Sequence, residues 1–224
     1  MRDLKLSPED AAECLEDAAH GDASSADLWA SLIVDAAVRN DGFVERTPLC
    51  LLSVQGHQHF LSRLALVPQQ ATPPSRGIGR RKTEISEVDC LREALFASWA
   101  RPDATPSLRW DPHEDVRYVL RATDPTDSKI KEKTQHGANR LAAIGLSVLT
   151  VVPQRWAGRT RLRMPGGKRG ADAFIFTWPI WTDPMSLAAI RSLLGHPGLD
   201  DPATGRRSAS SSAVGRGGFR RGSL

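Results

Sequence analysis

Apolar residues recur at helical spacing in the first third of the chain and again near its middle. Ser7-Pro-Glu-Asp is a typical helix start, so the pattern predicts a helix over residues 8–20. Apolar positions three and four apart predict further helices over residues 26–38, 58–67 and 84–99. The last is the most regular, because its apolar residues form one stripe and its charges lie opposite.

Shorter apolar and β-branched runs dominate the second half of the chain. Residues 159–164 and 173–178 have the character of strands and flank a Gly-rich turn, so we expect them to pair as a hairpin. A short helix is expected over residues 137–147, and a last helix over residues 187–194. A helical N-terminal part followed by mixed short strands and helices predicts an α+β fold.

Composition divides the chain into four expected parts. Residues 1–67 form an acidic, mainly helical part, and residues 68–82, rich in Pro, Gly and Arg, form a linker loop. Residues 83–196 form a basic α+β part. Residues 197–224 are a low-complexity basic tail, which we expect to be disordered because it has too little apolar area to bury.

The net charge of +4 hides an uneven distribution along the chain. Residues 1–60 hold 11 acidic and 4 basic residues, which leaves 15 acidic and 26 basic residues in the rest of the chain. A region with such an excess of cations attracts polyanions, of which nucleic acid is the most common. The distribution therefore predicts an acidic first part and a second part able to approach nucleic acid.

Several classes of protein are excluded or disfavoured. No apolar run among the 224 residues is long enough to span a membrane, and the first residues show no secretory signal, so we expect a cytoplasmic protein without a membrane partner. Cys14, Cys50 and Cys90 are too few and too far apart for a disulfide framework or a zinc site. His57 and His59 lack an obvious third ligand, so we expect neither a metal nor another cofactor.

The candidate nucleic-acid-binding residues are basic side chains in four segments. Such residues bind phosphates through counterion release and carry no sequence information. They are Arg80, Arg81, Lys82, Lys129, Lys131, Lys133, Arg140, Arg159, Arg161 and Arg163. Trp156 lies close to the last three, and an aromatic ring among cations suits stacking on a single-stranded base. We nevertheless expect Trp156 to be a half-buried anchor.

A second interpretation is a Mg²⁺-dependent nuclease built on Asp115, Asp127 and Lys129. Two acids at this separation with a following Lys resemble the layout of restriction-type nucleases, in which the metal generates hydroxide and the Lys stabilises phosphate charge. In such enzymes the second acid and the Lys lie on an apolar strand, whereas residues 124–129 are turn residues. No other catalytic motif is present, so we do not expect an enzyme.

Five segments together resemble a known family in their order and spacing. They are Gln55-Gly-His-Gln-His-Phe-Leu, Leu108-Arg-Trp-Asp-Pro-His-Glu-Asp-Val-Arg-Tyr, Asp124-Pro, Gly137-Ala-Asn-Arg-Leu-Ala and Phe176-Thr-Trp-Pro-Ile-Trp. The matching stretches span roughly residues 43–194 and are similar to the C-terminal part of a CRISPR-associated protein of type I-G systems, formerly type I-U. Members of that family have a longer N-terminal part, and the chain here continues past Leu194 into the basic tail.

The resemblance implies a non-catalytic subunit of an RNA-guided antiviral effector complex, with guide RNA, target DNA and other effector subunits as partners. In such complexes, pairing with the guide reads the sequence while protein subunits grip the backbone. Strand cutting in type I systems belongs to a separate helicase-nuclease. A structural adaptor that binds a protein partner through the acidic part, without nucleic acid, is the third interpretation.

Overall fold

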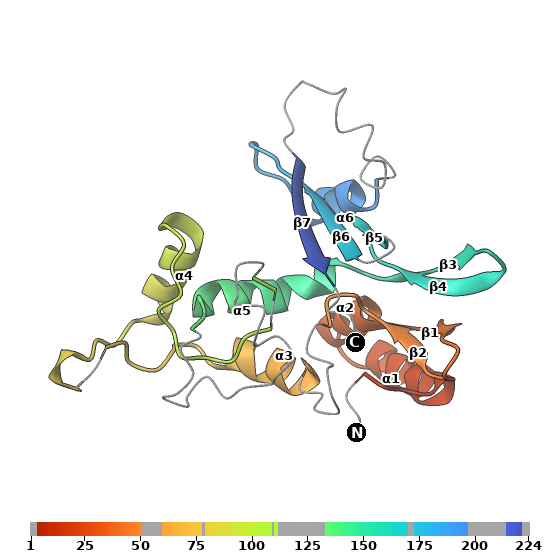
Figure 1. The fold of residues 1–224 in the computed structure, drawn as a ribbon, viewed down its shortest axis with the longest axis horizontal. Helices are drawn as coiled ribbons and strands as arrows, with labels where there is room; N and C mark the ends of the chain where they lie inside the picture. The colour runs from red at the N-terminus through yellow and green to blue at the C-terminus, as the bar shows by residue number, and fades with distance from the viewer. Residues whose placement is uncertain are drawn as a thin grey trace. The chain divides into compact units, whose positions relative to one another are not determined.

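The computed structural model describes residues 4–50, 60–77, 79–108, 110–111, 133–169, 173–196 and 214–220 (Figure 1). Helices and short antiparallel strand pairs combine in an α+β fold, as the sequence predicted. The chain divides into two compact units. The first consists of Met1–Leu4 and Leu49–Leu146, and the second of Lys5–Pro48 and Ser147–Leu224. No helix in the described part of the chain is long and apolar enough to cross a membrane.

The second unit begins with two helices and a two-stranded sheet. Helix α1 (Pro8–His20) starts where predicted, because the Ser7 hydroxyl accepts a hydrogen bond from the backbone N–H of Asp10. Helix α2 (Ala23–Leu32) follows, and the chain then turns into strand β1 (Ile33–Val38), which pairs antiparallel with β2 (Val44–Arg46). The prediction of one helix over residues 26–38 is therefore wrong. The β-branched pair Ile33-Val34 is buried on the strand instead.

The strands of the second half pair differently from the predicted hairpin. Strand β4 (Arg159–Arg163) pairs with β3 (Val152–Trp156), because residues 157 and 158 form a tight turn between them. Strand β6 (Ala173–Pro179) pairs instead with β5 (Gly167–Arg169) on one side and with β7 (Val214–Arg220) on the other.

Two elements near the C-terminus complete the second unit. Helix α6 (Leu187–Leu194) has the predicted bounds and is capped by Ser186. Strand β7 lies in the segment expected to be a disordered tail, where Val214–Arg220 pairs antiparallel with β6. The rest of the tail, residues 197–213 and 221–224, lies outside the described residues.

The first unit is helical and contains three packed helices. Helix α5 (His136–Gly145), which continues into the short η3 (Leu146–Val148), contacts both α3 (Phe60–Gln69) and α4 (Glu87–Phe96). The core of the unit includes Phe60, Leu64, Val67, Cys90 and Leu108. Residues 68–82, expected as a linker loop, lie inside the first unit, where the carbonyl groups of Pro68 and Gln70 are hydrogen-bonded to Arg140 and His136.

Helix α4 is shorter than predicted and does not bury its apolar stripe in the described part of the chain. Val88, Leu95 and Phe96 are exposed, and Cys90 is the buried residue of the helix. The helix approaches α5 closely at one point, where Gly137 of α5 lies directly against the backbone of Cys90. Helix α4 therefore contacts α5 through a small-residue contact and not through its large apolar residues.

Candidate nucleic-acid interface

A two-residue turn determines the geometry of the β3–β4 hairpin. Ala157 and Gly158 have positive φ angles of 47° and 78°, the pattern of a type I′ turn, whose twist matches that of the flanking strands. Trp156 and Arg159 are consequently directly opposite each other on the last rung of the ladder. Figure 1 shows β3 and β4 as a ribbon whose turn lies at its free end.

The register brings the three arginines of β4 to one face of the hairpin. Trp156 is paired with Arg159, Gln154 with Arg161, and Val152 with Arg163. Because side chains alternate along a strand, these six residues share one face, which we call the Arg–Trp face. Leu162 belongs to the opposite face and is buried. The hairpin thus has one face that anchors it and one that presents cations and an indole ring.

Strand β2 and the turn before it fix two of these arginines. The Nη1 of Arg161 donates to Oε1 of Glu45 at 2.7 Å, and the backbone N–H of Leu162 donates to the other carboxylate oxygen at 2.8 Å. Glu45 itself is only 3% exposed. The Nη1 of Arg159 donates to Oδ1 of Asn40 at 2.6 Å. Arg159 therefore has a neutral partner that orients its guanidinium, whereas the charge of Arg161 is partly balanced.

Trp156 is 70% exposed, so the expectation of a half-buried anchor is wrong. All five positions of β3 are exposed, and the indole stands at the end of the ladder beside the turn. Burial of Leu162 anchors the hairpin in place of Trp156. The sequence signal that could have indicated this is the Ala-Gly pair directly after Trp156, which is compatible with a tight turn.

Arg80, Arg81 and Lys82 lie in a closed loop of the first unit. The loop is closed by two backbone hydrogen bonds between Arg76 and Thr83, of 2.9 and 2.8 Å, and contains the short helix η1 (Gly79–Arg81). All three cations are exposed, and none forms an ion pair with another described residue. The geometry is therefore compatible with the predicted phosphate contacts at this loop.

Arg140 is in a different situation, because its side chain is only 12% exposed. Its Nη1 donates to the carbonyl of Ala71 at 3.1 Å and to Glu87 at 2.8 Å, and its Nε donates to the carbonyl of Pro68 at 3.3 Å. The guanidinium thus joins α5 to α4 and to the end of α3. This geometry serves internal packing and does not favour the predicted phosphate contact.

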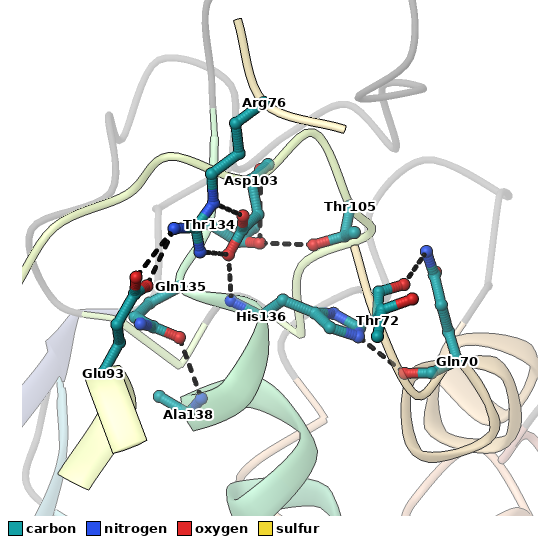
Figure 2. A network of polar contacts seen from close by, with 10 residues as sticks. All are labelled: Gln70, Thr72, Arg76, Glu93, Asp103, Thr105, Thr134, Gln135, His136 and Ala138. Carbon is teal, nitrogen blue, oxygen red and sulfur yellow. Dashed lines mark hydrogen bonds and ion pairs between the residues drawn. The ribbon is translucent and has the colours of Figure 1, made fainter. Parts of the chain in front are cut away.

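A buried polar network in the first unit was not anticipated from the sequence (Figure 2). The fully buried carboxylate of Asp103 accepts hydrogen bonds from Arg76, at 2.7 Å from Nε, and from the backbone N–H of His136 at 3.0 Å. Arg76 also donates to both carboxylate oxygens of Glu93, at 2.8 and 3.1 Å. Two backbone hydrogen bonds join Asp103 to Thr134. The buried charge is therefore paired and hydrogen-bonded, the condition under which burial is tolerated.

The ionisation of this network indicates a structural role. Burial alone lowers the pKa of the Arg76 guanidinium, but its hydrogen bonds to Asp103 and Glu93 outweigh burial and raise the pKa, so Arg76 stays charged. Burial lowers the pKa of His136, whose Nε2 lies 2.7 Å from the carbonyl oxygen of Gln70. Burial raises the pKa of the Cys90 thiol, because it disfavours the charged thiolate, which is the reactive form. These groups hold helices and loops together.

The remaining predicted residues fall partly outside the described part of the chain. Lys133 is described and exposed. Lys129 and Lys131 of the lysine series, Asp115 and Asp127 of the nuclease interpretation, and the pair His57 and His59 lie outside the described residues. Among the described residues, no group of three His, Cys, Asp or Glu side chains could hold a metal ion.

The comparisons with known proteins found no significant match to a protein-family model, to a curated protein or to a solved structure.

Proposed function

We propose that this protein is a non-catalytic subunit of an RNA-guided type I CRISPR effector complex that contacts the backbone of guide RNA or target DNA. The observation that carries the nucleic-acid contact is the Arg–Trp face, on which Arg159, Arg161 and Arg163 alternate along one strand. Membership of the effector complex rests on the five ordered sequence segments that resemble the type I-G protein. Such a complex acts in the cytoplasm and relies on a separate helicase-nuclease for strand cutting.

The arginine spacing supports a contact along a phosphate backbone. Alternate residues of a strand are about 7 Å apart, so the three arginines of β4 follow one another at this spacing along the Arg–Trp face. Arginine donates several hydrogen bonds in a planar arrangement that matches phosphate oxygens. A row of this kind binds polyanions irrespective of sequence, which suits a subunit of a complex in which the guide supplies the sequence recognition.

Salt-dependent binding of the full chain to a labelled single-stranded RNA tests the contact. Log K falls as log salt rises, and we call the magnitude of this dependence the salt slope. Each phosphate contact that is lost lowers the salt slope by about 0.7 for a single strand. Arg159→Gln removes one cation and leaves the Arg161–Glu45 pair intact, so it should lower the slope by about that amount. Arg39→Gln is the matched control, since Arg39 is an exposed arginine of the same unit that pairs with Asp41.

A second measurement tests the assembly. The tagged full chain is recovered from its host at moderate salt, and the copurifying RNA and proteins are identified. Short guide-sized RNA together with other effector subunits supports the proposal. Recovery of the protein alone, combined with no salt-sensitive RNA binding in the first experiment, would overturn it and favour a protein adaptor.

A further inference from the structure

The indole of Trp156 is exposed at the end of β3, on the same face as the arginines of β4. A single exposed apolar side chain is normal on a protein surface and needs no explanation by itself. Trp156 differs because it forms the last rung of the ladder with Arg159, directly before the Ala157-Gly158 turn. Strand pairing holds the backbone up to Trp156 and the turn holds the backbone after it, so a flat ligand can stack on the ring without first ordering the backbone.

The turn next to Trp156 consists of two small residues, Ala157 and Gly158. A Cβ atom built on Gly158 meets nothing within 4 Å, and Ala157 contributes only a methyl group to the turn. The ring therefore stands beside a part of the turn that carries no large side chain. A planar group that approaches the ring from the turn therefore meets only the small residues Ala157 and Gly158.

The positive charges beside the ring suit the phosphate group of a nucleotide whose base stacks on Trp156. Asn40 orients the guanidinium of Arg159 through its amide oxygen and does not neutralise it. Arg161 follows two residues along the same face, about 7 Å further from the tip. A base stacked on Trp156 would therefore have a charged guanidinium at its side, where the sugar–phosphate backbone continues. This combination of aromatic stacking and cationic backbone contacts is typical of single-strand binding.

We propose that Trp156 is a base-stacking platform and that the Arg–Trp face binds single-stranded nucleic acid in preference to duplex. The inference rests on the nucleic-acid contact proposed above and adds the strand type and the residue that selects it. In a duplex, neighbouring bases cover both faces of each internal base, so the indole can stack only where the strands are apart. The duplex has the phosphates that the arginines need but does not offer a free base to Trp156.

The test compares a labelled RNA strand of about 16 nucleotides, the upper end of the site size of one single-strand-binding module, with its duplex. We expect the full chain to bind the strand more tightly than the duplex. Trp156→Ala should weaken binding of the strand by roughly 5- to 150-fold, which corresponds to the loss of one stacked base. The salt slope should stay unchanged because no cation is removed. Trp156→Phe should retain most of the affinity.

A matched control and the contrary outcomes separate this inference from the proposed function. Trp99→Ala removes another exposed tryptophan, which is 55% exposed in the first unit, and should leave binding unchanged. If Trp156→Ala binds the strand as wild type does while Arg159→Gln lowers the salt slope, stacking is overturned and the backbone contact stands. Equal binding of strand and duplex by the wild type also overturns the inference. If the wild type binds neither, the proposed function fails as well.

Discussion

Replacement of Gly137 by alanine tests the contact between α4 and α5. Gly137 is the second residue of α5, and a Cβ atom added there would lie 2.5 Å from the carbonyl oxygen of Cys90 and 3.0 Å from its carbonyl carbon. It would also lie 3.1 Å from the Cβ atom of Ala94. The first two are backbone atoms of α4, so no side-chain rotation relieves the clash. The two helices must separate by a sizeable fraction of an ångström or lose their hydrogen-bond geometry.

Two opposing effects determine the sign of the change. Alanine is a better helix former than glycine and gains up to about 1 kcal/mol at an unhindered helical position. Overpacking at a tight contact costs about 1–3 kcal/mol, and the cost is at the upper end where backbone must move. We therefore expect Gly137→Ala to lower the free energy of unfolding by about 1–2 kcal/mol.

Gly145 provides the control inside the same helix. A Cβ atom built there meets nothing within 4 Å, so Gly145→Ala should raise the free energy of unfolding by about 0.5–1 kcal/mol through helix propensity alone. The same chemical change in one helix is thus expected to act in opposite directions at two positions. A general effect of alanine on the unfolded chain would instead move both variants the same way.

Urea unfolding combined with peptide-resolved alkylation of Cys90 measures the effect in the right unit. Cys90 is fully buried at the contact, so its labelling reports the opening of the first unit independently of the second. Gly137→Ala should shift the midpoint of Cys90 exposure to lower urea and speed its labelling in native buffer. If Gly137→Ala proves as stabilising as Gly145→Ala, the two helices do not touch at this point and the reasoning is refuted.

Two further predictions concern the hairpin and the buried histidine. Ala157 has a positive φ, a conformation that costs most non-glycine residues about 1 kcal/mol and that Asn adopts more readily. Ala157→Asn should therefore raise the stability measured by thermal unfolding by roughly 0.5–1 kcal/mol. A loss of stability would contradict the type I′ turn. Burial lowers the pKa of His136; the contact with the Gln70 carbonyl and the charge of Asp103 oppose this shift, and the charge of Arg140 reinforces it. The Nδ1 of His136 has no hydrogen-bond partner among the described residues. The folded state thus binds a proton on His136 less well than the unfolded state does. This contribution to the free energy of unfolding is fully present above the unfolded pKa of about 6.5, and it is lost at lower pH by up to about 1.4 kcal/mol per pH unit. His136→Gln should flatten that part of the unfolding curve against pH, and an identical slope in variant and wild type would show that His136 does not titrate there.

The elements that the sequence predicted correctly carry their signals locally. Ser7 and Ser186 each accept a hydrogen bond from an N–H three residues later, and these caps mark the starts of α1 and α6. Such a signal lies within one helical turn, so a single sequence contains all of it. The predictions of these two helices therefore needed no knowledge of the rest of the fold.

The elements that were mispredicted depend on partners far along the chain. Ile33 is paired with Arg46 in a strand, although the spacing of its neighbours also fits a helix. Strand β4 was identified, but its partner was taken to be β6, because the Gly-rich segment after residue 164 outweighed the two residues before Arg159. The Asp103 network joins residues about thirty positions apart and has no period or motif that a sequence pattern could reveal.

The candidate interface shows why counting cations along a sequence overestimates a binding surface. Arg140 lies in a run that resembles a phosphate site, yet it bonds to Glu87 and to two backbone carbonyls. Arg161 is balanced by Glu45, a residue 116 positions away that no local pattern connects to it. Arg159 has the neutral Asn40 as partner and keeps its charge for an external ligand. The charge that a face offers is therefore determined by the long-range partner of each arginine, and of these two arginines of the hairpin, Arg159, beside Trp156, is the one whose removal should matter more.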